Sequence, residues 1–359
     1  MKIDRVETLP LEPRFKGDGY AMSMGRQTVL YHRLLRLTAD DGTVGVGEFV
    51  RPPTWSVAEI EALEDDCLPA LQGIDLADLP ALLAIWRDGE KRLQYVVAGI
   101  DLAMLDMMGR ALGLPVSSLL GGARAADCPE YLSLSCEAPE VMAEIVRAQS
   151  QSFDVVQAKL GSDTLDNDLT RVRAVLGAMR PDQRLLADFN GALKPDDAIR
   201  ALPEINDPRV MWEEPCDEYD DGLAVARGID ASVMLDQCLK DLPTYMRAIQ
   251  DRAAAALVIK SDSIGGLSVG RTVRDACAAA AIKVRIDGWW AGQVAGAGAL
   301  HLAVGTPPAM LISSIDLTDP IDTDRSMIAR PAPGRVCAGP GPGLGTIPET
   351  LFPAEEDGQ

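Results

Sequence analysis

The sequence has few histidines and no paired cysteines, the patterns that most often bind zinc or form disulfides. It has only two histidines, and its seven cysteines stand singly, with no C-x-x-C pair. This distribution gives no indication of a zinc site and no disulfide framework. We expect the cysteines to be small buried hydrophobic residues in a reduced, cytoplasmic protein.

Positive charge and long apolar runs are also scarce. The net charge of −20 argues against nucleic acids and anionic membrane surfaces as partners, since both bind basic patches. No apolar run approaches the roughly 20 residues of a membrane-spanning helix. The N-terminal stretch MKIDRVETLP has acids where a signal peptide would be apolar. We therefore expect no nucleic acid partner, no membrane partner and no export.

The N-terminal third contains both strand and helix patterns. Residues 28–48 predict two strands around an Asp-Asp-Gly turn, and residues 1–9 would complete a small antiparallel sheet. Three helical segments follow, at 57–72, 79–91 and 93–112. These patterns predict an α+β domain over residues 1–124.

Beyond that domain, short apolar runs alternate with helical segments. The runs end at Ser133–Ser135, Lys159, Asp188, Glu213, Asp236, Lys260, Asp287 and Asp316. Helical patterns between them include 167–179, 239–249, 267–281 and 294–304. Eight strand–helix units close a barrel, and no glycine fingerprint of an open nucleotide-binding sheet follows an early strand. The predicted fold class is α/β: a modified (β/α)8 barrel over 125–329 with an N-terminal α+β capping domain, to which 330–359 return.

Acidic residues end three consecutive predicted strands. The segments LLADFN, VMWEEP and VMLDQ place Asp188, Glu213 and Asp236 side by side at the barrel mouth, with Asn190 and Glu214 nearby. Carboxylates so close repel one another, and a divalent cation removes the repulsion. An all-oxygen set favours Mg²⁺ or Mn²⁺ over zinc. The alternative is that these are ordinary loop acids, of which the chain has many.

Two lysines end strands on opposite sides of the predicted ring. Lys159 ends the second strand and Lys260 the sixth, so that they would flank a ligand held at the acidic site. A lysine beside a metal ion and a second lysine has its pKa lowered towards neutrality, and it can then act as a general base. The alternative is that each lysine forms an ion pair with a neighbouring carboxylate.

The motifs resemble those of one known family. Residues 98–122, AGIDLAMLDMMGRALGLPVSSLLGG, are similar to the signature helix of the mandelate racemase and muconate lactonizing branch of the enolase superfamily. The ordered series Lys159, Asp188, Glu213-Glu214-Pro215, Asp236 and Lys260 resembles its active site. The resemblance implies a homo-oligomeric enzyme that removes the proton α to a carboxylate with one Mg²⁺, or Mn²⁺, held by Asp188, Glu213 and Asp236. Glu213 is preferred to Glu214 because the family's ligand stands two residues before the proline.

The sequence departs from the family pattern at two strand ends. The family often has K-x-K where this chain has Gln157-Ala158-Lys159, and Asp-Glu where it has Asp236-Gln237. The mandelate racemase type of site uses a histidine at the end of the seventh strand, whereas His32 and His301 fall elsewhere, and we expect both to be structural. The resemblance is therefore to the two-lysine group that acts on muconates, dipeptides and amino-acid derivatives.

Several residues are candidates for contact with a small, amino-acid-like carboxylate. Acids after the last two strands could hold a substrate ammonium, a tryptophan of the pair 289–290 could lie against it or simply pack, and two cap loops could cover it. The candidates are Lys16, Tyr20, Met22, Trp55, Gln157, Asn190, Asp287, Trp289, Asp316 and Asp319.

The predicted reaction keeps its alternatives. The segments 157–161, 263–266 and 287–292 resemble those of enzymes acting on proline betaines and hydroxyprolines. That resemblance favours a 2-epimerase or racemase of a proline-type amino acid or betaine, with a cis-3-hydroxyproline dehydratase as the alternative. A muconate cycloisomerase, a dipeptide epimerase and a non-catalytic binding protein are further alternatives.

Overall fold

The computed structural model describes residues 1–51, 55–89, 91–288, 290–315, 321–322 and 325–352. The N-terminal part forms an antiparallel sheet in the order β1 (Ile3–Leu11), β5 (His32–Ala39) and β6 (Val44–Val50). The helices α1 (Val57–Cys67), α2 (Leu79–Arg87) and α3 (Leu93–Leu112) follow. The predicted hairpin and the three helices are thus present, although α1 and α2 end earlier than predicted.

Small residues let α3 lie directly on the cap sheet. Gly45 and Gly47 of β6 face this helix, where an added Cβ would stand 2.3 Å from the Ala103 carbonyl oxygen and 2.1 Å from that of Gly99. Only glycine permits so close an approach of two backbones. The sheet and the long helix therefore pack as one layer on another.

The rest of the chain forms a barrel of eight parallel strands, as predicted. In order they are β8 (Tyr131–Leu134), β9 (Val155–Lys159), β10 (Arg184–Asp188), β11 (Val210–Glu213), β12 (Ser232–Leu235), β13 (Ala256–Lys260), β14 (Lys283–Asp287) and β15 (Leu311–Ser314). A parallel bridge between Glu130 and Ser314 joins the first strand to the last. The modified barrel with a capping domain is therefore confirmed.

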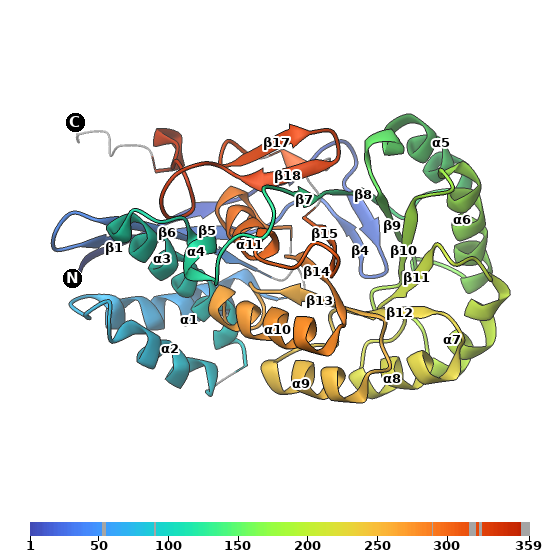
Figure 1. The fold of residues 1–359 in the computed structure, drawn as a ribbon, viewed down its shortest axis with the longest axis horizontal. Helices are drawn as coiled ribbons and strands as arrows, with labels where there is room; N and C mark the ends of the chain where they lie inside the picture. Colours follow the sequence, from blue (N-terminus) through green and yellow to red (C-terminus); the bar gives the residue numbers. More distant parts are fainter. Residues whose placement is uncertain (52–54, 90, 289, 316–320, 323–324, 353–359) are drawn as a thin grey trace.

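Helices cover the outside of the barrel (Figure 1). They are α5 (Pro139–Gln149), α6 (Leu165–Ala178), α7 (Pro195–Ala201), α8 (Tyr219–Gly228), α9 (Leu242–Asp251), α10 (Leu267–Ala280) and α11 (Gln293–Val304), and the short α4 (Val116–Leu119) follows α3. None of the helices in the described part of the chain is long and apolar enough to cross a membrane.

The barrel interior has an apolar layer below a polar one. The apolar layer comprises Tyr131, Val155, Leu186, Met211, Met234, Ala256, Val258 and Ile312. Successive side chains of a strand point to opposite faces, so the residue two positions further on also points inward. That position holds Gln157 after Val155, Asp188 after Leu186 and Glu213 after Met211. The alternation of side chains along each strand therefore places a layer of polar groups at the carboxyl ends of the strands.

Two buried acids of the cap lie at the first turns of barrel helices. Asp101 of α3 accepts hydrogen bonds from the Ser268 backbone N–H (3.0 Å) and hydroxyl (2.6 Å) at the start of α10. Glu48 of β6 accepts from the N–H groups of Gly292 and Ala295, each at 2.9 Å, at the start of α11. Helix N-termini favour negative charge, so these contacts hold the cap against the barrel.

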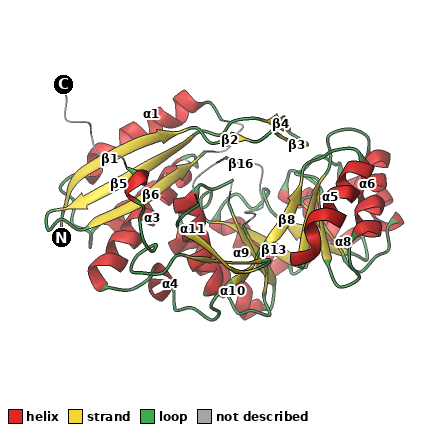
Figure 2. Cartoon of the chain, turned by 90° about the horizontal axis from the view of Figure 1, so that it is seen from above, coloured by secondary structure: helices red, strands yellow, loops and turns green. Residues whose placement is uncertain are grey.

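A small hairpin of the cap lies over the end of β8. It consists of β3 (Tyr20–Met22) and β4 (Gly25–Gln27), and the pair β2 (Arg14–Phe15) and β16 (Ile321–Asp322) lies close to it (Figure 2). The Ala21 N–H donates to Ser135 Oγ at 2.9 Å, and the Cys136 N–H donates to the Ala21 carbonyl at 2.9 Å.

The C-terminal part of the described chain returns to the cap. β17 (Ile328–Ala332) pairs with β18 (Arg335–Ala338), which in turn pairs with β7 (Cys128–Pro129). The Leu344 N–H then donates to Asp106 of α3 at 2.7 Å. These contacts agree with a C-terminal return, while the division of the domains at residues 124 and 329 stays a proposal.

Candidate active site

The three predicted metal ligands lie together at the carboxyl ends of β10, β11 and β12. Asp188 and Glu213 are partners in register on adjacent strands, and Asp236 directly follows β12. All three are at most 3% exposed. The Gln157 amide nitrogen joins two of them, donating to Asp188 Oδ2 at 3.1 Å and to Glu213 Oε2 at 2.9 Å.

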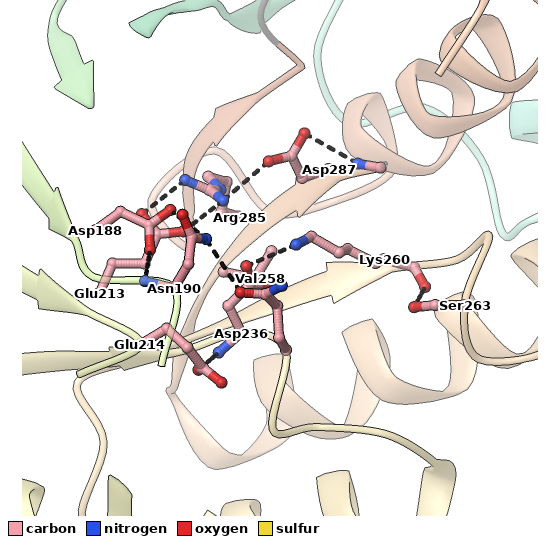
Figure 3. Close-up of polar contacts among 12 residues, drawn as sticks. Asp188, Asn190, Glu213, Glu214, Asp236, Val258, Lys260, Ser263, Arg285 and Asp287 are labelled. Atoms are coloured by element: carbon pink, nitrogen blue, oxygen red, sulfur yellow. Dashed lines mark hydrogen bonds and ion pairs between the residues drawn. The ribbon is translucent and has the colours of Figure 1, made fainter. Parts of the chain in front are cut away.

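Each of these carboxylates also pairs with a cationic side chain, as Figure 3 shows for Asp236 and Glu213. Lys159 Nζ lies 2.5 Å from Asp188 Oδ2, and Lys260 Nζ lies 2.6 Å from Asp236 Oδ2. Arg285 lies 2.6 Å from Glu213 Oε1. With the side chains so arranged, the described residues contain no group of three His, Cys, Asp or Glu that could hold a metal ion. The ion pairs expected as the alternative for the lysines are therefore present.

The chemistry of the donor set nevertheless fits a hard divalent cation. Three buried carboxylates converge on one place, and Asp236 Oδ1 has no hydrogen-bond partner among the described residues. Leaving such a buried acceptor unpaired costs about 1–3 kcal/mol. Oxygen ligands of this kind suit Mg²⁺.

Glu214 faces away from the other acids. It accepts hydrogen bonds from the backbone N–H groups of Asp236 (2.6 Å) and Cys238 (2.5 Å), and its own φ is +40°. This left-handed conformation turns its side chain to the next strand end while Glu213 points into the barrel (Figure 3). The geometry therefore supports Glu213, and not Glu214, as the candidate ligand.

Burial and charge shift the pKa values of these groups in defined directions. Burial raises the pKa of Glu213 to about 7, an effect that Arg285 opposes and Asp188 and Asp236 reinforce. Burial lowers the pKa of Lys159, but Asp188 and Glu213 outweigh it and the net pKa is raised. Lys260 behaves in the same way beside Asp236 and Asp287. The sequence predicted lowered lysine pKa values, but the surrounding protein groups raise them, because each ammonium contacts a carboxylate.

A cavity opens over this cluster. It is lined by six of the residues predicted from the sequence, namely Met22, Gln157, Lys159, Asn190, Lys260 and Asp287. The remaining lining residues are Met24, Tyr131, Ser133, Arg285, Gly288, Trp290, Ala291, Ile315 and Arg325. Lys159 on β9 and Lys260 on β13 thus reach one cavity from separate sides of the barrel.

Three candidate substrate contacts lie beside this cavity or away from it. The Tyr20 hydroxyl contacts Ser133 Oγ, and its ring packs at 5.6 Å from that of Trp290. Lys16 does not reach the cavity because it is exposed on the loop before β3. Trp55 packs at 4.6 Å against the ring of Tyr95 and lines a different hollow. Trp289, Asp316 and Asp319 lie outside the described residues.

The polar partners of Asp287 differ from expectation. Its Oδ2 accepts from the Tyr131 hydroxyl at 3.0 Å and lies 2.9 Å from Arg285, and its Oδ1 accepts from the Gly288 N–H at 2.9 Å. A carboxylate with these partners is part of a buried network. Asp287 also lines the cavity, so its contact with a substrate ammonium stays a prediction.

The histidines are structural, as expected. His32 Nδ1 lies 2.8 Å from Glu48, and His301 Nδ1 accepts from the Ser117 N–H at 3.3 Å. Burial lowers the pKa of His301 to about 4. Neither histidine lines the cavity.

Arg285 is the main polar residue that the sequence interpretation missed. It is 1% exposed and contacts Glu213 and Asp287, and its guanidinium lies 5.2 Å from the centre of the Tyr131 ring. The segment KVRID (283–287) contained enough information to predict that Arg285 points into the barrel. An arginine two residues before Asp287 shares its inward face, and a charge within an apolar strand is the same feature that drew attention to the lysines.

Two family descriptions match successive parts of the chain. Residues 6–121 match the mandelate racemase/muconate lactonizing enzyme N-terminal domain, and residues 140–349 match the enolase C-terminal domain-like family. The chain therefore belongs to the mandelate racemase and muconate lactonizing family of the enolase superfamily, and it is an isomerase or a lyase.

Individual relatives cover nearly the whole chain. The cis-3-hydroxy-L-proline dehydratase of Roseibium aggregatum is 27% identical, covering 97% of this chain and 96% of its own. The L-Ala-D/L-Glu epimerase of Bacillus subtilis is 26% identical, with 99% and 100% covered. An enolase superfamily member from Roseovarius nubinhibens, complexed with magnesium, superposes with a TM-score of 0.88 at 27% identity, covering 98% and 96%.

Proposed function

We propose that this enzyme removes the α-proton of a small, amino-acid-like carboxylate in a Mg²⁺-dependent reaction, and that it is a 2-epimerase of a proline-type amino acid or betaine. One observation carries the proposal: Lys159 and Lys260 reach the same cavity from strands β9 and β13, which three other strands separate on one side of the ring. Two such bases can serve the two faces of one carbon atom.

In this proposal Asp188, Glu213 and Asp236 hold Mg²⁺. When bound, Mg²⁺ supplies the positive charge that stabilises the enolate left by proton removal. Lys159 takes the α-proton on one face, and Lys260 returns a proton on the other. A lysine acts as a base only after its ammonium group has lost a proton, and an ion pair with a carboxylate opposes that loss. The ion pairs of Lys159 with Asp188 at 2.5 Å and of Lys260 with Asp236 at 2.6 Å must therefore open first.

A second candidate reaction is dehydration of a cis-3-hydroxyproline. The Roseibium relative named for that activity, 27% identical over almost the whole chain, favours it. The first step would be the same proton removal. The second lysine would then protonate the departing β-hydroxyl, and inversion at the α-carbon would not occur.

Proton NMR in D₂O with Mg²⁺ tests both reactions. The panel comprises prolines, proline betaines, 4- and cis-3-hydroxyprolines, dipeptides and muconates. An epimerase exchanges the α-hydrogen and forms the other epimer, whereas a dehydratase releases a keto or imino product. If no compound exchanges its α-hydrogen or reacts, and several bind, the chain is a binding protein and the proposal is wrong.

A further inference from the structure

A chain of hydrogen bonds runs from the cap hairpin to two of the carboxylates. The Tyr20 hydroxyl contacts Ser133 Oγ, which lies 3.0 Å from Gln157 Oε1. Gln157 Nε2 donates to Asp188 Oδ2 at 3.1 Å and to Glu213 Oε2 at 2.9 Å. The four contacts connect the cap with strands β8, β9, β10 and β11.

The carboxylates determine the direction of every hydrogen bond in this chain. Ionised carboxylates only accept, so the Gln157 amide nitrogen must face them and its oxygen must face Ser133. That oxygen needs a donor, which is the Ser133 hydroxyl. The Ser133 proton is thereby used, and the Tyr20 hydroxyl is left as the donor to Ser133.

Gln157 is the central member of this chain. It is 1% exposed and points into the barrel, between two carboxylates that are in register on adjacent strands. Without the Ser133 hydroxyl its amide oxygen would be buried and unpaired, or the amide would rotate and turn that oxygen onto the carboxylates. Either change disturbs the separation and orientation of Asp188 and Glu213.

The position of Tyr20 depends on how the hairpin docks. Besides Tyr20, the hairpin is held at the end of β8 through Ala21, which bonds with Ser135 and Cys136. Met22 of the same strand lines the cavity. The hairpin that covers the cavity is therefore also the start of the hydrogen-bonded chain.

We propose that Tyr20, Ser133 and Gln157 are positioning residues that couple docking of the cap hairpin to the arrangement of Asp188 and Glu213, and so to the affinity for a divalent cation. This inference rests on the proposed function, in which both carboxylates are Mg²⁺ ligands. Groups that orient metal ligands contribute to metal affinity. Because coupling is reciprocal, a bound cation stabilises the docked hairpin by the same factor.

Calorimetric titration of the full chain with Mg²⁺, without substrate, tests the coupling. Gln157→Leu and Ser133→Ala should weaken Mg²⁺ binding at least tenfold, within the range of about 10–100-fold for such orienting groups. Tyr20→Phe should weaken it less, and Ser133→Thr, which keeps the hydroxyl, should bind as the wild type does. Ser135→Ala, which removes a docking contact of the hairpin but no member of the chain, should weaken the affinity less than Ser133→Ala does. Thr170→Ala is the control, since it removes an exposed hydroxyl of α6 that donates to the Asp166 carbonyl at 2.8 Å, and it should leave the affinity unchanged.

Hydrogen exchange distinguishes coupling from a purely structural role. Mg²⁺ should slow amide exchange in residues 20–27 of the wild type but not of Ser133→Ala. Gln157→Leu or Ser133→Ala could fail to fold. In that case Tyr20→Phe, which loses only a hydroxyl of the cap, tests the coupling by the same two measurements, Mg²⁺ affinity and amide exchange. Wild-type Mg²⁺ affinity in the folded variants overturns the coupling alone, provided that Asp236→Asn loses binding. A wild type that binds no Mg²⁺ overturns both the coupling and the proposed metal site.

Discussion

Replacing Arg285 with methionine should destabilise the barrel strongly. The guanidinium is 1% exposed and lies 2.6 Å from Glu213 and 2.9 Å from Asp287. Methionine keeps much of the volume but leaves two buried carboxylates without their cation. Removing one partner of a buried ion pair costs about 3–5 kcal/mol, against a total stability of about 5–15 kcal/mol for a typical protein.

Urea unfolding followed by circular dichroism measures this loss. The matched control is Arg247→Met, because Arg247 pairs with Asp220 at 2.5 Å on the surface, where the two side chains are 52% and 73% exposed. That exchange should leave the urea midpoint close to that of the wild type, because exposed ion pairs contribute little to stability. Adding Glu213→Gln to Arg285→Met should recover part of the loss, because it removes one of the two uncompensated charges.

The loss should also depend on pH. Burial already raises the pKa of Glu213 to about 7 although Arg285 opposes this effect, so removal of Arg285 raises the pKa further and the folded variant retains a proton that the unfolded chain releases. The deficit of Arg285→Met relative to the wild type should therefore grow as pH rises above about 7, where Glu213 ionises in the wild type while the variant's carboxyl still holds its proton. A variant as stable as Arg247→Met at pH 8 would refute the reasoning about this network.

Three further predictions follow from the contacts described above. Asp236→Asn should abolish activity and weaken Mg²⁺ binding in calorimetry while the fold survives, whereas the exposed Asp230→Asn should change neither; equal affinities would contradict the ligand assignment. Because burial lowers the pKa of His301 from 6.5 to about 4, the unfolded state binds its proton first, and about 3 kcal/mol of stability should be lost as pH falls through that window. His301→Asn should flatten this part of the stability–pH curve, and an unchanged slope would show that another group titrates. Gly266→Ala should destabilise by about 1–3 kcal/mol in thermal unfolding, since φ is +106° and the new Cβ would lie 2.4 Å from a buried carboxylate, while Gly177→Ala, with nothing within 4 Å, should not.

The strand ends could be predicted because each combines an apolar run with one abrupt charge. Lys159, Asp188 and Glu213 each end the strand that they were expected to end, and Lys260 and Asp287 do so as well. The positions of these strand ends can therefore be found from the local sequence pattern alone. Which charges then pair with one another depends on distances around the ring, which no local pattern encodes.

Residues whose roles arise from the closed ring were harder to predict. Arg285 pairs with Glu213, three strands away, only because the barrel closes. The pairing of Asp287 with Tyr131 and Arg285 was not predictable in the same way, because the three residues come from distant parts of the sequence. The position of Lys16 depended on how the cap loops fold over the mouth, and composition alone does not determine that.

The most direct test of the central claim is α-hydrogen exchange in D₂O by the two lysine variants, measured with separate enantiomers of a substrate that the wild type epimerises. Lys159→Ala should still exchange the α-hydrogen of one enantiomer, and Lys260→Ala that of the other, while neither variant completes the inversion. Lys240→Ala, in which an exposed lysine paired with Glu218 at 3.1 Å is removed, is the control and should behave as the wild type does. Exchange of both enantiomers by either single variant would show that the two lysines do not serve opposite faces of the α-carbon.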